Sequence, residues 1–110
     1  MTQIKQGDII YADLSPTNGH EQRGRRPLLV LSNDIVRDYS NVVTVAPISS
    51  TIRRLPLYKE LPHGLITSGV VLLDQIRTID FNARNASKTE EVPDDYLEEV
   101  LDVARRIFTK

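Results

Sequence analysis

A short charged segment leads from a glycine-containing loop into an apolar run. Three arginines and one carboxylate stand within six positions of this segment: Glu21, Arg23, Arg25 and Arg26. Arg26 is followed at once by Pro27 and then by apolar residues that must be buried. This position holds a guanidinium at a set angle to a rigid strand, as a phosphate-binding or oxyanion-binding site requires. The pattern therefore predicts an anion site centred on Arg26.

A second group of hydroxyl and basic residues follows a β-branched run. Residues 49–51 carry three hydroxyls in a row, and Arg53 and Arg54 follow in the next loop. Residues 1–88 hold eleven Lys and Arg against eight Asp and Glu, whereas residues 89–110 hold three against seven. Because local fields decide which ligand docks where, the mildly basic body suits an anionic partner although the net charge is −1.

The segments that must position these residues read as short strands. We predict strands at residues 9–12, 27–31, 42–48 and 57–61. A further strand is predicted at residues 70–79, with one face exposed to solvent. The run at 27–31 is apolar throughout, so we expect it to be buried on both faces. Between strands, Ser32-Asn33-Asp34 is expected to cap one helical turn reaching about Tyr39. Residues 82–88 are weakly patterned, and we expect a turn and a short strand there.

The C-terminal segment has the clearest helical pattern. Pro93 suits the first turn, acidic residues gather near the start, and basic residues gather near the end. One apolar stripe at helical spacing is expected to be core: Tyr96, Leu97, Val100, Leu101, Ala104, Ile107 and Phe108. Short strands and one helix without a βαβ rhythm predict a mainly β fold, a small twisted sheet or barrel with a C-terminal helix. The length predicts a single domain, residues 1–110.

Composition excludes several classes of site. There is no cysteine, hence no disulfide, no thiol nucleophile and no zinc ribbon. The two histidines, His20 and His63, are far apart along the chain and do not indicate a metal site. No apolar run approaches the roughly 18 residues of a membrane span, and the N-terminus lacks a signal-peptide pattern. We therefore expect a cytoplasmic protein with no cofactor and no membrane association.

Several short motifs occur in one fixed order along nearly the whole chain. They are Gly7-Asp8-Ile9, Leu14-Ser15-Pro16, Gly19-His20-Glu21-Gln22, Gly24, Arg26-Pro27, Ala46-Pro47-Ile48-Ser49-Ser50 and Leu73-Asp74-Gln75-Ile76-Arg77-Thr78-Ile79. In this order they resemble the MazF/PemK toxin family. The resemblance implies a sequence-specific, metal-independent endoribonuclease of a type II toxin–antitoxin pair. It also implies an SH3-like β-barrel with a C-terminal helix, a homodimer, and a small MazE-like antitoxin as partner.

The resemblance assigns chemistry to three residues. Arg26 is implied to be the catalytic arginine, Ser49 stands where the family usually has a catalytic threonine, and Glu21 matches an acidic loop position. In RNA the 2′-hydroxyl attacks the adjacent phosphate, so the enzyme must align the nucleotide and stabilise negative charge. Arg26 and Ser49 would stabilise that phosphate, while Glu21 would act as base or orient Arg26. The products expected are a 2′,3′-cyclic phosphate and a 5′-hydroxyl.

The expected substrate is single-stranded RNA read through base edges. Aromatic residues make up only 5% of the chain, so few side chains are available to stack on the bases of a single strand. The residues expected to contact RNA are Arg23, Arg25, Asn33, Ser50, Arg53, Arg54 and Gln75. An acidic, apolar antitoxin tail is expected to lie across the same basic groove and to inhibit by occlusion.

Each role has a structural alternative at the level of the residues. Arg26 can form a surface ion pair with Glu21, and Ser49 can simply end a strand. Asn33 can cap a helix, and Gln75 can pair with backbone. The arginines of the second loop can be solvated. At the level of function, the alternatives are a gyrase-poisoning toxin and an antitoxin-binding regulatory homologue without nuclease activity.

Overall fold

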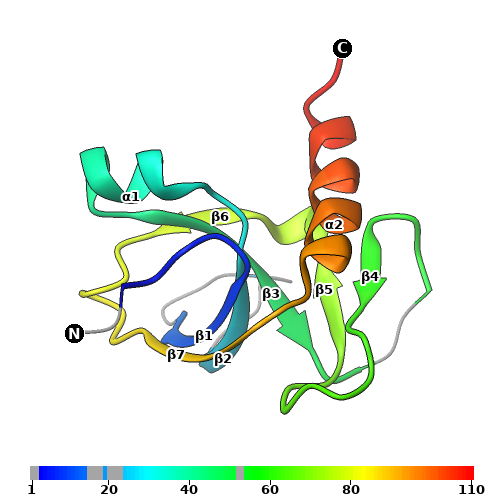
Figure 1. Cartoon of the computed structure of the whole chain (residues 1–110), viewed down its shortest axis with the longest axis horizontal. Coiled ribbons are helices and arrows are strands. Elements are labelled where there is room, and N and C mark those ends of the chain that lie inside the picture. The colour runs from blue at the N-terminus through cyan, green and yellow to red at the C-terminus, as the bar shows by residue number, and fades with distance from the viewer. Residues whose placement is uncertain (1–2, 15–18, 20–23, 52–53) are drawn as a thin grey trace.

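The computed structural model describes residues 3–14, 19, 24–51 and 54–110 (Figure 1). The elements in chain order are β1 (Asp8–Asp13), β2 (Arg25–Val30), α1 (Asp34–Ser40), β3 (Val43–Ser49), β4 (Tyr58–Glu60), β5 (Val70–Leu72), the 3₁₀ turn η1 (Leu73–Gln75), β6 (Arg77–Ile79), β7 (Ser87–Glu91) and α2 (Asp94–Ile107). The predicted mainly β fold with a C-terminal helix is confirmed.

The strands form one antiparallel sheet around β3. Its order is β4-β5-β3-β2-β1-β7, and β6 also pairs with β3. Within the described part of the chain no pairing joins the end strands β4 and β7, so the sheet curves without closing. In Figure 1 α2 stands upright on one side of this sheet, and α1 lies apart from it at the upper left.

Both faces of the sheet are covered, because its central strands alternate between two apolar clusters. In β2, Leu28 and Val30 enter the cluster around Ile10 and Val45, which we call the inner cluster. Leu29, between them, points to the other face and enters a second cluster with Ile9, Ala46 and Ile48. Helix α2 covers this second cluster through Tyr96 and Val100. The prediction that residues 27–31 form a strand buried on both faces is borne out at Leu28, Leu29 and Val30, all fully buried.

The predicted continuous strand at 70–79 is wrong, because η1 interrupts it. Ile48 pairs with Val71, whereas Val45, three residues earlier, pairs with Arg77. Six residues on one side therefore span three on the other, and the 3₁₀ turn absorbs the excess. The alternation along 74–79 came from residues that leave the sheet and return to it.

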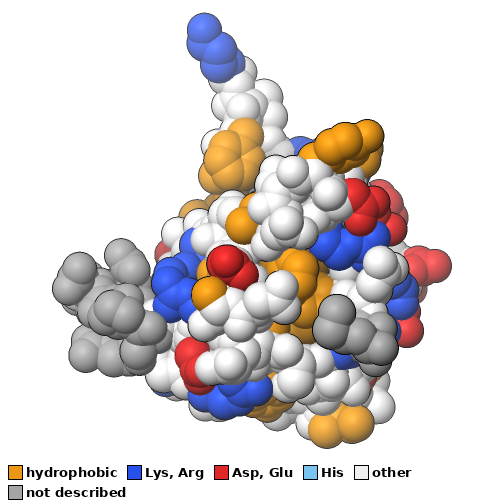
Figure 2. Space-filling view, turned by 90° about the vertical axis from the view of Figure 1, so that its left-hand side faces the viewer, with side chains coloured by type: hydrophobic (Ala, Val, Ile, Leu, Met, Phe, Trp, Pro, Cys, Tyr) orange, Lys and Arg blue, Asp and Glu red, His pale blue; other side chains and the backbone are white. Residues whose placement is uncertain are grey.

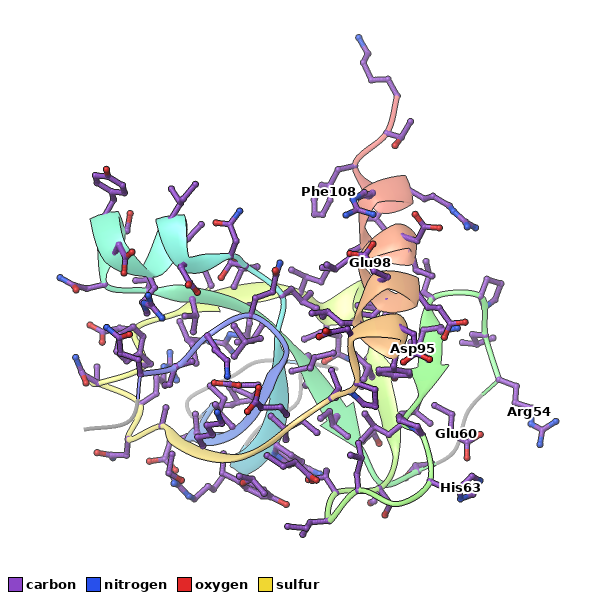
Figure 3. All side chains as sticks on the ribbon, viewed as in Figure 1. Arg54, Glu60, His63, Asp95, Glu98 and Phe108 are labelled. Carbon is purple, nitrogen blue, oxygen red and sulfur yellow. The ribbon has the colours of Figure 1, made fainter. Side chains whose placement is uncertain are left out.

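The helical stripe is core only over its first part. Tyr96 and Val100 are buried, but Phe108, just beyond the helix, is 75% exposed. Together with Leu31 and Ile76 it borders a shallow apolar groove of about 290 Å³ beside the helix end. The expectation that the whole stripe is core is thus wrong at its C-terminal end, where Figure 3 shows Phe108 beyond the body of the sheet.

Candidate active site at the start of β2 and the end of β3

Arg26 and Ser49 are brought together by strand register. β2 and β3 run antiparallel with Leu28 opposite Pro47 and Val30 opposite Val45. The recorded pairs end at Leu28 and Pro47; continued two residues further, the same register would set Arg26 opposite Ser49, with Cα atoms roughly 5 Å apart. Opposed residues lie on the same face of a sheet, so the guanidinium and the hydroxyl share one side.

The face that carries this pair is that of the inner cluster. Arg26 lies opposite Ala12 of β1, which is fully buried in that cluster. Just beyond, the Leu14 N–H donates to the Gly24 carbonyl at 2.9 Å and closes the hairpin at the base of its loop. Arg26 itself is half-buried. Its backbone is therefore fixed by pairing with β1, and the β2–β3 pairing begins two residues later, at Leu28.

Ser49 is nearly buried, with 8% of its surface exposed. Its Oγ accepts a hydrogen bond from the Thr51 N–H at 3.2 Å, and its backbone pairs with Val70 of β5. Accepting that bond uses one lone pair and leaves the hydroxyl proton free to be donated. A nearly buried, oriented hydroxyl opposite an arginine is a suitable donor pair for one phosphate.

A cavity of about 440 Å³ opens on the same face. Leu14 and Pro47 form one wall, and the opposite wall comes from η1 and β6: Asp74, Gln75, Ile76, Arg77 and Thr78. The Tyr58 hydroxyl donates to the Asp74 carboxylate at 3.0 Å and so orients it. The cavity thus has both an amide, Gln75, and a cation, Arg77, on the wall that faces Pro47.

Arg25 points to the other face of β2 and is engaged there. Its guanidinium lies 3.4 Å from the Asp13 carboxylate and donates to the Ser87 hydroxyl at 3.2 Å. Hydrogen bonds from the Asn85 amide and from Arg25 hold the pKa of Asp13 below its usual value. This arrangement ties β1, β2 and β7 together, and RNA would have to compete with it.

The structure separates some predicted RNA contacts from the pair. Asn33 caps α1, its Oδ1 accepting from the Ile35 N–H at 3.1 Å, and it lies beyond the far end of β2 from Arg26. Arg54 projects outward from its loop (Figure 3). Ser50 is exposed and lines a second cavity, beside the β4–β5 connection. Three other predicted residues lie outside the described part of the chain: Glu21, Arg23 and Arg53.

Sequence reasoning missed the wall formed by Asp74 and Arg77. Both residues belonged to the polar positions of the 70–79 run, and that polarity was the available signal. It was read as a solvent-facing strand side instead of a cavity wall. It also missed Gly69, which packs against the Ser49 carbonyl, since no local pattern marks a contact with a strand twenty residues earlier.

The face that carries α1 contrasts with the site. Figure 2 shows positive and negative side chains interspersed there, with apolar side chains between them. Such mixing produces no field of one sign. Among the residues that the structure describes, no three carboxylate or imidazole side chains gather as a metal site. No helix in that described part is both long enough and apolar enough to span a bilayer.

Comparison with known proteins gives consistent matches. A family model described as PemK-like, MazF-like toxin of type II toxin-antitoxin system matches residues 5–108. Endoribonuclease EndoA of Bacillus subtilis (strain 168) is 40% identical over 102 residues, covering 88% of this chain and 87% of the relative. The crystal structure of MazF from Deinococcus radiodurans superposes with a TM-score of 0.87 at 35% identity, covering 94% of each chain. A MazE-MazF crystal structure from the same organism gives 0.82 at 35% identity, again over 94% of each chain.

Proposed function

Since the chain belongs to the family of PemK-like, MazF-like toxins of type II toxin–antitoxin systems, we propose that it is an endoribonuclease that cuts single-stranded RNA at the Arg26–Ser49 pair. One relative, 40% identical to this chain, is named as an endoribonuclease. The family match supports an RNA substrate, and an arginine beside a hydroxyl suits the binding of its phosphate.

The observation that carries the proposal is the register of β2 on β3. Continued past Leu28 and Pro47, it would set Arg26 and Ser49 across from one another, on the face where Pro47 borders an open cavity. A bidentate guanidinium and a hydroxyl donor on one phosphate match the needs of phosphoryl transfer, in which positioning and charge stabilisation do most of the work. If Arg26 only formed a surface ion pair and Ser49 only ended a strand, the two residues would not need to lie on the same face of the sheet.

The proposed reaction uses the nucleophile carried by RNA itself. The ribose 2′-oxygen attacks the adjacent phosphorus, the bond to the 5′-oxygen breaks, and a 2′,3′-cyclic phosphate and a 5′-hydroxyl result. Arg26 stabilises the phosphoryl oxygens as charge develops, and Ser49 donates a further hydrogen bond to one of them. A base, for which Glu21 is the candidate, takes the 2′-hydroxyl proton, and the leaving oxygen gains one. No divalent ion enters this scheme.

The proposed partners follow from the relatives and from the apolar groove. A MazE–MazF pair occurs among the related structures, and by analogy we assign this chain a MazE-like antitoxin. A homodimer is supported by exposed Phe108 and by the groove that it borders with Leu31 and Ile76. An exposed large aromatic beside an apolar groove is typical of an association surface. Cleavage of cellular mRNA would place the protein in the cytoplasm.

The direct test is incubation of the pure protein with a long, defined single-stranded RNA in EDTA, followed by mapping of the ends. Cleavage at a recurring short motif, with cyclic-phosphate and 5′-hydroxyl ends, supports the proposal. Intact RNA together with inhibited DNA supercoiling would identify a gyrase poison instead. Intact RNA with tight antitoxin binding and unaffected supercoiling would identify a regulatory homologue.

A further inference from the structure

A second cavity lies just past Ser49, between Ser50 and the connection from β4 to β5. Its volume is about 400 Å³, within the roughly 300–1,000 Å³ of small-molecule sites. Polar side chains line it, among them Ser50, Glu60, His63 and Ser68. None of these residues has a role in the phosphate chemistry assigned to Arg26 and Ser49.

The cavity is placed to receive the nucleotide next to the cut phosphate. Ser50 directly follows Ser49, and strand residues advance by roughly 3.3 Å. Gly69, on the opposite wall, packs against the Ser49 carbonyl. Figure 1 shows the end of β3 and the β4–β5 connection together at the bottom of the molecule. The cavity therefore adjoins the Ser49 backbone at the end of β3.

The charge in the cavity selects a base over a phosphate. Glu60 presents a carboxylate, which accepts hydrogen bonds and donates none at neutral pH. It repels phosphate, and it accepts from the exocyclic amino group of adenine, cytosine or guanine. Uracil has no such amino group: its one edge donor, N3–H, lies between two carbonyl oxygens, which a carboxylate repels. His63 lines the same cavity as Glu60, and an imidazole ring can stack on an unpaired base (Figure 3).

The wall of the cavity is pre-organised by a residue on another strand. Glu90 of β7 accepts from the Ile66 N–H at 2.9 Å and from the Thr67 N–H at 2.7 Å. The base of the connection is closed by the Leu61 N–H, which donates to the Gly69 carbonyl at 2.9 Å. A connection fixed in this way loses little further freedom when a ligand binds.

From these contacts we propose that this cavity, hereafter the base pocket, reads one unpaired base beside the scissile phosphate, with Glu60 selecting bases that carry an exocyclic amino group. The inference rests on the proposed ribonuclease function and adds a specificity determinant to it. Residues of the phosphate site set the rate, and residues of the base pocket set the motif.

The test uses the cleavage motif once the ends have been mapped on a long RNA. Oligonucleotides carrying that motif are made with the amino group deleted at one base at a time, as inosine for guanosine, purine riboside for adenosine or pyrimidin-2-one riboside for cytidine. For the wild type we expect one position next to the cut where the deletion lowers kcat/KM roughly tenfold or more. In Glu60→Gln the amide can also donate, so discrimination at that position should fall to within about twofold.

The matched control is Glu98→Gln, an exposed carboxylate on α2 (Figure 3), which should discriminate as the wild type does. Binding of the same sequences with a 2′-deoxy sugar at the cut, measured by fluorescence anisotropy, separates recognition from cleavage. Loss of discrimination in Glu60→Gln alone supports the base pocket, even where RNA is bound and not cut. Unchanged discrimination in Glu60→Gln, or no position sensitive to amino deletion, overturns it while leaving a nuclease intact. Absence of both binding and cleavage overturns both proposals.

Discussion

A β-carbon on Gly69 would lie 2.2 Å from the carbonyl oxygen of Ser49, so β5 enters the sheet closer to the end of β3 than any side chain allows. Gly69 also has a φ of +131°, a backbone conformation that L residues rarely adopt. The position of Ser49 therefore depends on the absence of a side chain on the neighbouring strand.

Gly69→Ala should displace Ser49 and lower both stability and cleavage. Overpacking of this kind typically costs about 1–3 kcal/mol. Thermal unfolding and kcat/KM on RNA measure the two effects. Gly64→Ala is the matched control for unfolding, because Gly64 also has a positive φ, of +97°, but open space where its β-carbon would be; it lines the base pocket, so the two variants are compared by unfolding only. Equal losses in the two variants would show that strain, and not the contact with Ser49, matters.

Arg26→Ala should abolish most cleavage while the protein stays folded. Removing a guanidinium that stabilises phosphoryl charge costs on the order of 10³–10⁵ in kcat. Arg26→Lys should recover only a small part, since lysine keeps the charge and loses the bidentate geometry. Single-turnover cleavage and circular dichroism give the readouts. Full activity in either variant would remove Arg26 from the chemistry.

Ser49→Ala should lower kcat roughly a hundredfold, the usual cost of one lost donor to a developing oxyanion. Ser49→Thr keeps the hydroxyl and should stay within about tenfold of the wild type. Because Ser49 Oγ also accepts from the Thr51 N–H, unfolding temperatures must be compared in parallel. A Ser49→Ala variant that loses stability and keeps its kcat would make Ser49 purely structural.

Glu90 should make the β4–β5 connection sensitive to acid. Burial pushes the pKa of Glu90 up, but hydrogen bonds from the Ile66 and Thr67 N–H groups outweigh it, so the pKa lies below its ordinary value. A depressed pKa gives stability that is complete above the unfolded value near 4.5 and is lost as pH falls through the folded value. Amide exchange at Ile66 and Thr67 should therefore accelerate from about pH 7 to about pH 3, relative to intrinsic rates. Glu90→Gln should flatten that dependence, and an unchanged pH profile would contradict the assignment.

Phe108→Glu should weaken self-association. A charge at this 75% exposed position beside the apolar groove must be desolvated when a second copy binds. Light scattering across a dilution series should show a raised dimer dissociation constant with little change in unfolding of the monomer. Lys110→Glu, at the exposed chain end, is the control. A dimer equally stable in both variants would place the interface elsewhere.

Local patterns predicted the elements well because each carries its own periodicity. The apolar run at 27–31 and the helical spacing from Tyr96 to Val100 correspond to buried structure. The anion site at Arg26 was predicted from its place before Pro27, and the β2–β3 register, continued past Leu28 and Pro47, would set Ser49 opposite. Register itself cannot be read from one strand, since it depends on two segments about twenty residues apart.

What the sequence did not reveal depends on contacts between distant segments. The break at η1 arises because the segment from Val71 to Arg77 is longer than the segment of β3 with which it pairs. A pattern among neighbouring residues cannot show this difference in length. Phe108 is exposed because the C-terminal end of α2 extends past the part of the sheet that the helix covers. The capping role of Asn33, in contrast, depends only on neighbouring residues, and it was among the alternatives read from the sequence.

The three surplus residues at η1 have a consequence for how this molecule could diversify. They stand outside the ladder, so substitutions at Asp74 or Gln75 alter the cavity wall without touching a buried strand partner. Mutations at these two positions avoid the core packing that holds Leu72, Leu73 and Ile79 in place. A descendant could thus acquire a new target preference by drift within one exposed turn while inheriting its cutting machinery unaltered.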